Sequence, residues 1–131
     1  MSDCVKIGKN AVRELFDKLK VMDKKALPLI DQGNNKFAVF AVQSENKRGK
    51  GELHEKADDI FMILHGDCVI ETGGELVNKQ MKAYTEYIGD DLKNSQKHQL
   101  SEGDLFTVPR NIPHLLDTTG MKVKCLCIKV Y

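Results

Sequence analysis

Two histidines and a pair of acids have the residue types that bind a catalytic divalent metal. His54 and His114 lie 60 positions apart in the chain, and Asp58 and Asp59 stand between them. Such a metal needs about three imidazole or carboxylate ligands, with one or more positions open to water or substrate. His54, one of the two acids and His114 would supply two imidazoles and one carboxylate. We therefore predict a site for iron, zinc or manganese.

Charged residues near His54 and His114 could complete this site. Glu52 precedes His54 by two positions, so on a strand both side chains point to the same side. Glu52 could add an oxygen ligand or act as the catalytic general base. Lys56 would share this face and repel a cation, or would bind an anionic substrate or pair with a nearby acid. Arg110 could bind a substrate carboxylate or phosphate at the mouth of the site.

The spacing of apolar residues predicts one helix followed by many short strands. Residues 10–22 repeat apolar side chains at three and four positions, as in an amphipathic helix. After a turn at 33–35, apolar, β-prone stretches punctuated by glycine and proline predict antiparallel strands of a jelly-roll barrel. The strands are expected at 36–42, 52–55, 60–64, 68–72, 105–108 and 121–131, with 60–72 forming a hairpin that turns at 65–67. Residues 73–99 are expected to form a long loop excursion with one short strand.

A longer motif ends at His114. Gly103 is followed by five residues, Pro109, one residue, Asn111, two residues and His114. This pattern resembles the second motif of the cupins, with Asn111 where that family favours glycine. Asparagine suits the position because it tolerates a positive φ.

The first cupin motif is present in degraded form. Six residues separate Asp59 from Gly66, as the motif requires, which favours Asp59 over Asp58 as the inward acid. The histidine pair of the motif falls on Glu52 and His54, or with a shortened gap on His54 and Lys56. Only one histidine of the pair remains in either alignment.

The chain thus resembles a small single-domain cupin over about residues 37–131. The resemblance implies an all-β fold, a double-stranded β-helix (jelly-roll) barrel with an N-terminal α-helix, as one domain over 1–131. It also implies a divalent metal held by His54, Asp59 and His114, beside a small organic substrate in the barrel. Dioxygenases, isomerases and lyases all occur among similar cupins. The alternative is a degenerate, inactive cupin that binds a small molecule, which the missing histidine and Lys56 favour.

The composition of the chain excludes several other classes of function. The 131 residues contain 20 Lys and Arg against 19 Asp and Glu, a formal net charge of +1, so we expect no binding to nucleic acid or membranes. We find neither a membrane-spanning stretch nor the apolar core of a signal peptide, and expect a cytoplasmic protein. The four cysteines should be reduced, with Cys125 and Cys127 in the core beside Val123. A homodimer is expected, because the outer sheet and the helix offer apolar edges.

Overall fold

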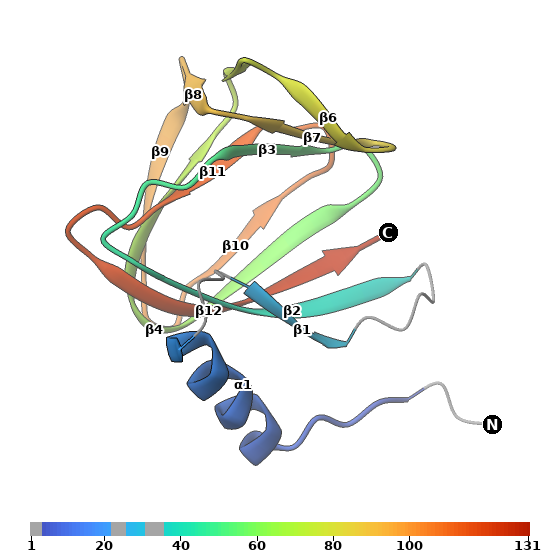
Figure 1. Cartoon of the computed structure of the whole chain (residues 1–131), viewed down its shortest axis with the longest axis vertical. Coiled ribbons are helices and arrows are strands. Elements are labelled where there is room, and N and C mark those ends of the chain that lie inside the picture. The colour runs from blue at the N-terminus through green and yellow to red at the C-terminus, as the bar shows by residue number, and fades with distance from the viewer. Residues whose placement is uncertain (1–3, 22–25, 31–35) are drawn as a thin grey trace.

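The structure is a curled antiparallel β-sheet with one helix outside it (Figure 1). The computed structural model describes residues 4–21, 26–30 and 36–131, so the predicted turn at 33–35 and residue 22 lie outside the described ranges. Within these ranges no helix has the length and apolarity needed to cross a membrane. The elements are α1 (Lys9–Val21), β1 (Ala26–Ile30), β2 (Phe37–Glu45), β3 (Gly51–His54), β4 (Asp58–Thr72), β5 (Glu75–Val77), β6 (Gln80–Ala83), β7 (Glu86–Gly89), β8 (Asp91–Lys93), β9 (Gln96–Ser101), β10 (Leu105–Val108), β11 (His114–Asp117) and β12 (Lys122–Val130).

The strand order shows how the sheet closes around its interior. The main sheet runs β1-β2-β12-β4-β11-β3-β7-β6, and β9 and β10 also pair with β4. In Figure 1 the strands β1, β2 and β12 face β3, β7 and β6 across the interior. The predicted all-β jelly-roll fold with an N-terminal helix is confirmed.

The long strand β4 corrects the predicted hairpin at 60–72. Gly66 does not reverse the chain, because it pairs with Val123 of β12 and the strand continues through it. The first half of β4 pairs with β10 and β12, and the second half pairs with β9 and β11. A bulge at Leu64, between the pairs Cys125–Ile63 and Lys124–His65, offsets the alternation by one residue. Phe61 and Ile63 before the bulge, and Cys68 and Ile70 after it, therefore all enter the same core.

Replacing Gly66 with alanine should destabilise the protein by about 3 kcal/mol. Gly66 has a φ of 80°, and a Cβ on it would lie 2.0 Å from the carbonyl oxygen of Lys122. Gly73 is the matched control, since its φ is 81° but nothing lies within 4 Å of its added Cβ. Gly73→Ala should cost about 1 kcal/mol, from the backbone strain alone. Urea denaturation measures both values, and equal losses would show that the contact with Lys122 is not what requires glycine.

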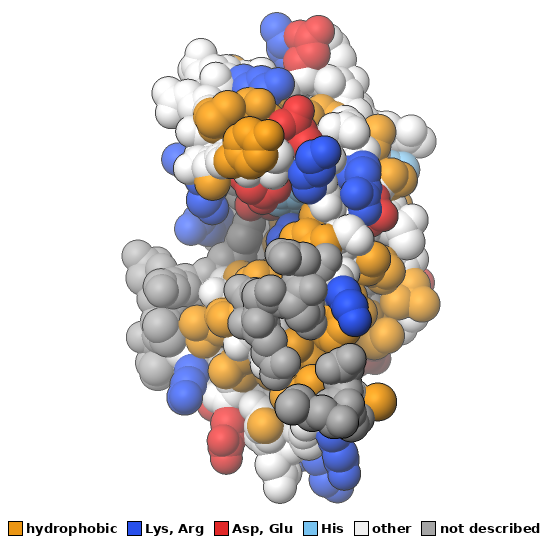
Figure 2. Space-filling view, turned by 90° about the vertical axis from the view of Figure 1, so that its right-hand side faces the viewer, with side chains coloured by type: hydrophobic (Ala, Val, Ile, Leu, Met, Phe, Trp, Pro, Cys, Tyr) orange, Lys and Arg blue, Asp and Glu red, His pale blue; other side chains and the backbone are white. Residues whose placement is uncertain are grey.

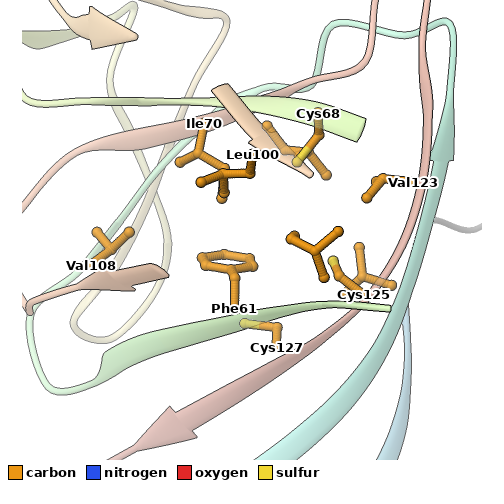
Figure 3. Packing of buried hydrophobic residues seen from close by; sticks show 11 residues of the cluster. Phe61, Cys68, Ile70, Leu100, Val108, Val123, Cys125 and Cys127 are labelled. Carbon is orange, nitrogen blue, oxygen red and sulfur yellow. The ribbon is translucent and has the colours of Figure 1, made fainter. Parts of the chain in front are cut away.

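The interior of the sheet is filled by aliphatic side chains and cysteines packed around Phe61 (Figure 3). Cys125 and Cys127 are buried on the same face as Val123, as predicted, and neither forms a disulfide. Burial in this core raises the pKa of the Cys68 thiol to about 11, so this thiol stays protonated and packs as an apolar group. The outer face is covered by α1, where Phe16 and Leu19 pack against Ala41 of β2.

Residues 73–99 form strands instead of the predicted loop. They contain β5, β6, β7, β8 and most of β9. Strand β6 is exposed along its whole length, and β9 buries only Leu100 fully. Their main chains pair with β7 and β4, while their side chains stay polar or exposed. These strands therefore lack the apolar alternation on which the prediction depended.

Candidate functional site

The two histidines meet because β3 and β11 are neighbours in the sheet. Glu52 of β3 pairs directly with His114 of β11, and His54 follows two residues later. The ring centroids of the two histidines are 5.1 Å apart. Asn111 has a φ of 69°, as its place in the motif predicted, and its backbone N–H donates to the carbonyl of His54. The bend before β11 is thus tied directly to the end of β3.

These residues line a cavity of about 260 Å³. This volume suits a small ligand, since pockets for drug-sized molecules measure about 300–1,000 Å³. Its described lining divides evenly into an apolar set (Ala26, Phe40, Val42, Phe61, Ile70, Leu116 and Cys127) and a polar set (Glu52, His54, Asp59, Lys82, Glu86, His114 and Lys129). On the face shown in Figure 2, histidine atoms are visible between acidic and basic side chains.

A larger groove of about 600 Å³ lies beside the bend of β4, away from the histidine pair. Lys20, His65, Lys122 and Lys124 contribute to its lining, but His65 is exposed and pairs with Glu102. The smaller cavity, in contrast, contains both buried histidines together with a buried carboxylate. We therefore take the smaller cavity as the candidate site.

A hydrogen bond at the Nδ1 atom of each imidazole fixes the orientation of the ring. His114 Nδ1 donates to the carbonyl oxygen of Ile112 at 3.1 Å, and His54 Nδ1 pairs with Glu86 Oε1 at 2.6 Å. A carbonyl or carboxylate oxygen accepts, so a hydrogen lies on each Nδ1, and in the neutral imidazole Nε2 then carries the lone pair. Metal-binding histidines are held in this way.

Glu52, His54 and His114 form a compact set of metal-binding atoms. One ligand atom from each of the three lies within 4.8 Å of the other two. By strict geometry His114 Nε2 is a buried atom without a hydrogen-bond partner, although Asp59 Oδ2 lies 3.3 Å away in a contact that lowers the pKa of that carboxyl. A buried acceptor without a donor is costly unless something binds it. The donor set therefore fits a divalent metal, with Glu52 supplying the carboxylate.

Asp59 is the inward acid, as its spacing to Gly66 predicted, but it is paired with a lysine. Asp59 is only 1% exposed, whereas Asp58 lies near the surface. Lys129 Nζ donates to Asp59 Oδ1 at 2.8 Å and to His54 Nε2 at 3.1 Å. One oxygen of Asp59 is therefore already bound to an ammonium group.

The charged groups of the site stabilise one another, and this offsets the cost of removing them from water. Burial would raise the pKa of Asp59, but the two imidazoles and the Lys129 ammonium hold it well below its usual range. Burial would lower the pKa of Lys129, yet the Asp59 carboxylate raises it above the usual value. Burial also opposes charge on His54, but contacts with Asp59 and Glu86 raise its pKa overall. Asp59 and Lys129 thus form an ionised buried pair.

Lys56 and Arg110, the predicted substrate-binding residues, do not line this cavity. Strand β3 ends at His54, and the bend that follows leaves Lys56 exposed instead of on the inward face. Arg110 donates two side-chain hydrogen bonds to Asp58 and one to the carbonyl of Val130. Its side chain therefore fastens the corner before β11 to the start of β4.

Two residues that complete the site were missed in the sequence. Lys129 continues the inward alternation of Val123, Cys125 and Cys127, so extending that pattern by two positions would have placed it inside. Glu86 lies in the segment expected to be a loop, and it reaches His54 because β7 pairs with β3. No local pattern marks Glu86.

Solved structures with the same architecture identify the fold. The DMSP lyase DddQ from Ruegeria pomeroyi superposes with a TM-score of 0.59 at 17% identity, covering 81% of this chain and 46% of that one. A cupin-like protein from Thermotoga maritima gives 0.57 at 16% identity, with 80% and 66% covered. The cupin domain of Schizosaccharomyces pombe Cnp3 gives 0.58 at 12% identity, with 80% and 59% covered. The chain has the cupin fold.

Comparisons of sequence, in contrast, give no match. No family model matches the chain, and no curated protein matches it. The chain also spans less than half the length of the DMSP lyase chain that it resembles. The likeness is therefore one of fold, and the function must be argued from the cavity.

Proposed function

We propose that this protein binds a divalent metal and a small organic ligand together inside the cupin barrel. The observation that carries the proposal is the pair of imidazoles whose Nδ1 atoms are tied to oxygen acceptors and which, with the Glu52 carboxylate, place three ligand atoms within 4.8 Å of one another. Three ligands of this kind leave positions open for a substrate, as in catalytic metal sites. We take Glu52 as the carboxylate ligand because it forms the compact set with the two imidazoles, whereas one oxygen of Asp59 is bound to the Lys129 ammonium.

A metal bound here would supply Lewis acidity that polarises a ligand oxygen. Glu86 holds the His54 ring in orientation, and the apolar wall formed by Phe40, Phe61 and Leu116 excludes water from the bound molecule. The reaction classes remain those of similar cupins, namely dioxygenase, isomerase or lyase. The fold likeness to a DMSP lyase favours keeping the lyase class among them.

Elemental analysis of the protein, purified without added metal or chelator, tests this proposal. We expect close to one equivalent of iron, zinc or manganese per chain, or its uptake after reconstitution. A matched preparation of Lys56→Ala should hold the same amount, because Lys56 is exposed outside the cavity. Failure of the native protein to retain any of these metals after reconstitution would overturn the proposal.

A second candidate function is small-molecule binding without a metal. Lys129 favours it, because its ammonium already contacts both His54 and Asp59 in the cavity. Under this alternative the ammonium binds an anionic group of the ligand directly. Ligand binding that is unchanged by a chelator, and lost in Lys129→Met, would support this alternative over the metal site.

A further inference from the structure

We propose that Lys129 is a built-in competitor of the metal, a tethered cation that occupies the site and lowers its metal affinity. The inference rests on the proposed metal site and concerns how that site is controlled. It follows from the position of a single ammonium group relative to the ligand atoms.

The sheet places Lys129 in the cavity by its register. Lys129 of β12 pairs directly with Asp59 of β4, and both side chains point inward. The side chain of Lys129 is 19% exposed and that of Asp59 is 2% exposed, so the pair lies largely out of water. A lysine in such a position is held by its partner carboxylate.

The ammonium and a metal would need the same atom. Lys129 Nζ lies 3.1 Å from His54 Nε2, the nitrogen that the Glu86 contact leaves free for a ligand bond. A lone pair that accepts a hydrogen bond from an ammonium cannot also bind a metal. Two cations this close also repel each other strongly in a partly buried cavity. Metal binding at His54 therefore requires that Nζ moves away.

The charge balance explains why a basic side chain is favourable in this cavity. The described polar lining contains three carboxylates, from Glu52, Asp59 and Glu86, and two ammonium groups, from Lys82 and Lys129. Removing Lys129 leaves three negative charges against one positive charge, with Asp59 almost fully buried. The four-carbon stem of lysine lets Nζ leave without a change in the backbone. Lys129 thus stabilises the metal-free cavity and is displaced when a metal enters.

The test is calorimetric titration of Zn²⁺ into the apo protein and its variants, with Co²⁺ absorption to report the ligand set. Lys129→Met should bind Zn²⁺ about 10- to 100-fold more tightly than the native chain, because it removes the ammonium and frees Asp59. Lys82→Met is the matched control. It removes the same charge from an exposed lysine on the cavity wall, and its affinity should change less than about threefold.

A second variant covers the case in which Lys129→Met fails to fold. Lys129→Met combined with Asp59→Asn removes both charges of the pair, and it should still bind Zn²⁺ more tightly than Asp59→Asn alone. Equal affinities within each comparison would overturn the inference and leave the metal proposal standing. Zn²⁺ binding by Lys129→Met but not by the native chain would support the inference and overturn the metal function of the native protein. Absence of binding in every variant would overturn both.

Discussion

Replacing Asp59 with asparagine is expected to lower the free energy of unfolding by about 3–5 kcal/mol. The substitution leaves the Lys129 ammonium in the cavity without its carboxylate, and an uncompensated buried charge is far more costly than a missing pair. The side chain of Lys129 is only 19% exposed, so water replaces the lost carboxylate only in part. Urea denaturation of the apo protein at pH 7 measures the change.

The neighbouring residue provides the control for this prediction. Asp58 pairs with Arg110 near the surface, so Asp58→Asn should cost about 1 kcal/mol or less. Adding Lys129→Met to Asp59→Asn should recover most of the lost stability, since a neutral pair carries no charge into the interior. A loss for Asp59→Asn no larger than that for Asp58→Asn would contradict the assignment of a buried ion pair.

Replacing His114 with alanine is expected to weaken Zn²⁺ binding by more than about 100-fold, since losing even an outer partner of a ligand costs about 10- to 100-fold. His114 supplies one of the two imidazoles of the compact set, and its Nε2 atom is buried without a hydrogen-bond partner, so the substitution removes a ligand that no second histidine replaces. Calorimetric titration measures the affinity, and circular dichroism verifies the fold of the variant.

His65→Ala is the matched control for this substitution. His65 lies on the exposed bend of β4, where it pairs with Glu102, and its loss should leave the affinity for Zn²⁺ unchanged. Equal Zn²⁺ affinity in the His114 and His65 variants would place the metal elsewhere on the protein.

The fold was predictable because its strongest signals are local. The segment from Gly103 to His114 requires a turn, a short strand and a corner in a fixed order, and Asn111 adopts the positive φ expected of it. The helix was also recognisable from its apolar spacing, and it spans Lys9–Val21 against the predicted 10–22.

The error at β4 has a different origin. A glycine between two apolar runs has the same local pattern in a hairpin turn as in a strand that bends. Pairing of Gly66 with Val123 decides between the two, and that partner is distant in the chain. Residues 73–99 were misjudged for a related reason, since strands that bury little on either face lack alternation.

The sequence was sufficient to predict that His54 and His114 lie close together. It was also sufficient to choose Asp59 over Asp58 as the inward acid. It did not reveal that Asp59 faces Lys129, because that contact depends on the register of β12 against β4. Glu86 depends likewise on the pairing of β7 with β3. Contacts between strands that are distant in the chain therefore decide which candidate residues share the cavity.

The bulge in β4 limits how the length of this chain can change. Because Leu64 is the one residue that brings both halves of the strand into the same core, deleting it would turn either Phe61 and Ile63 or Cys68 and Ile70 outward. The turn between β6 and β7 has no such restriction, since Tyr84 at its tip is 87% exposed. Natural variants should therefore gain and lose residues near Tyr84 while keeping the number of residues from Asp59 to Ile70 constant.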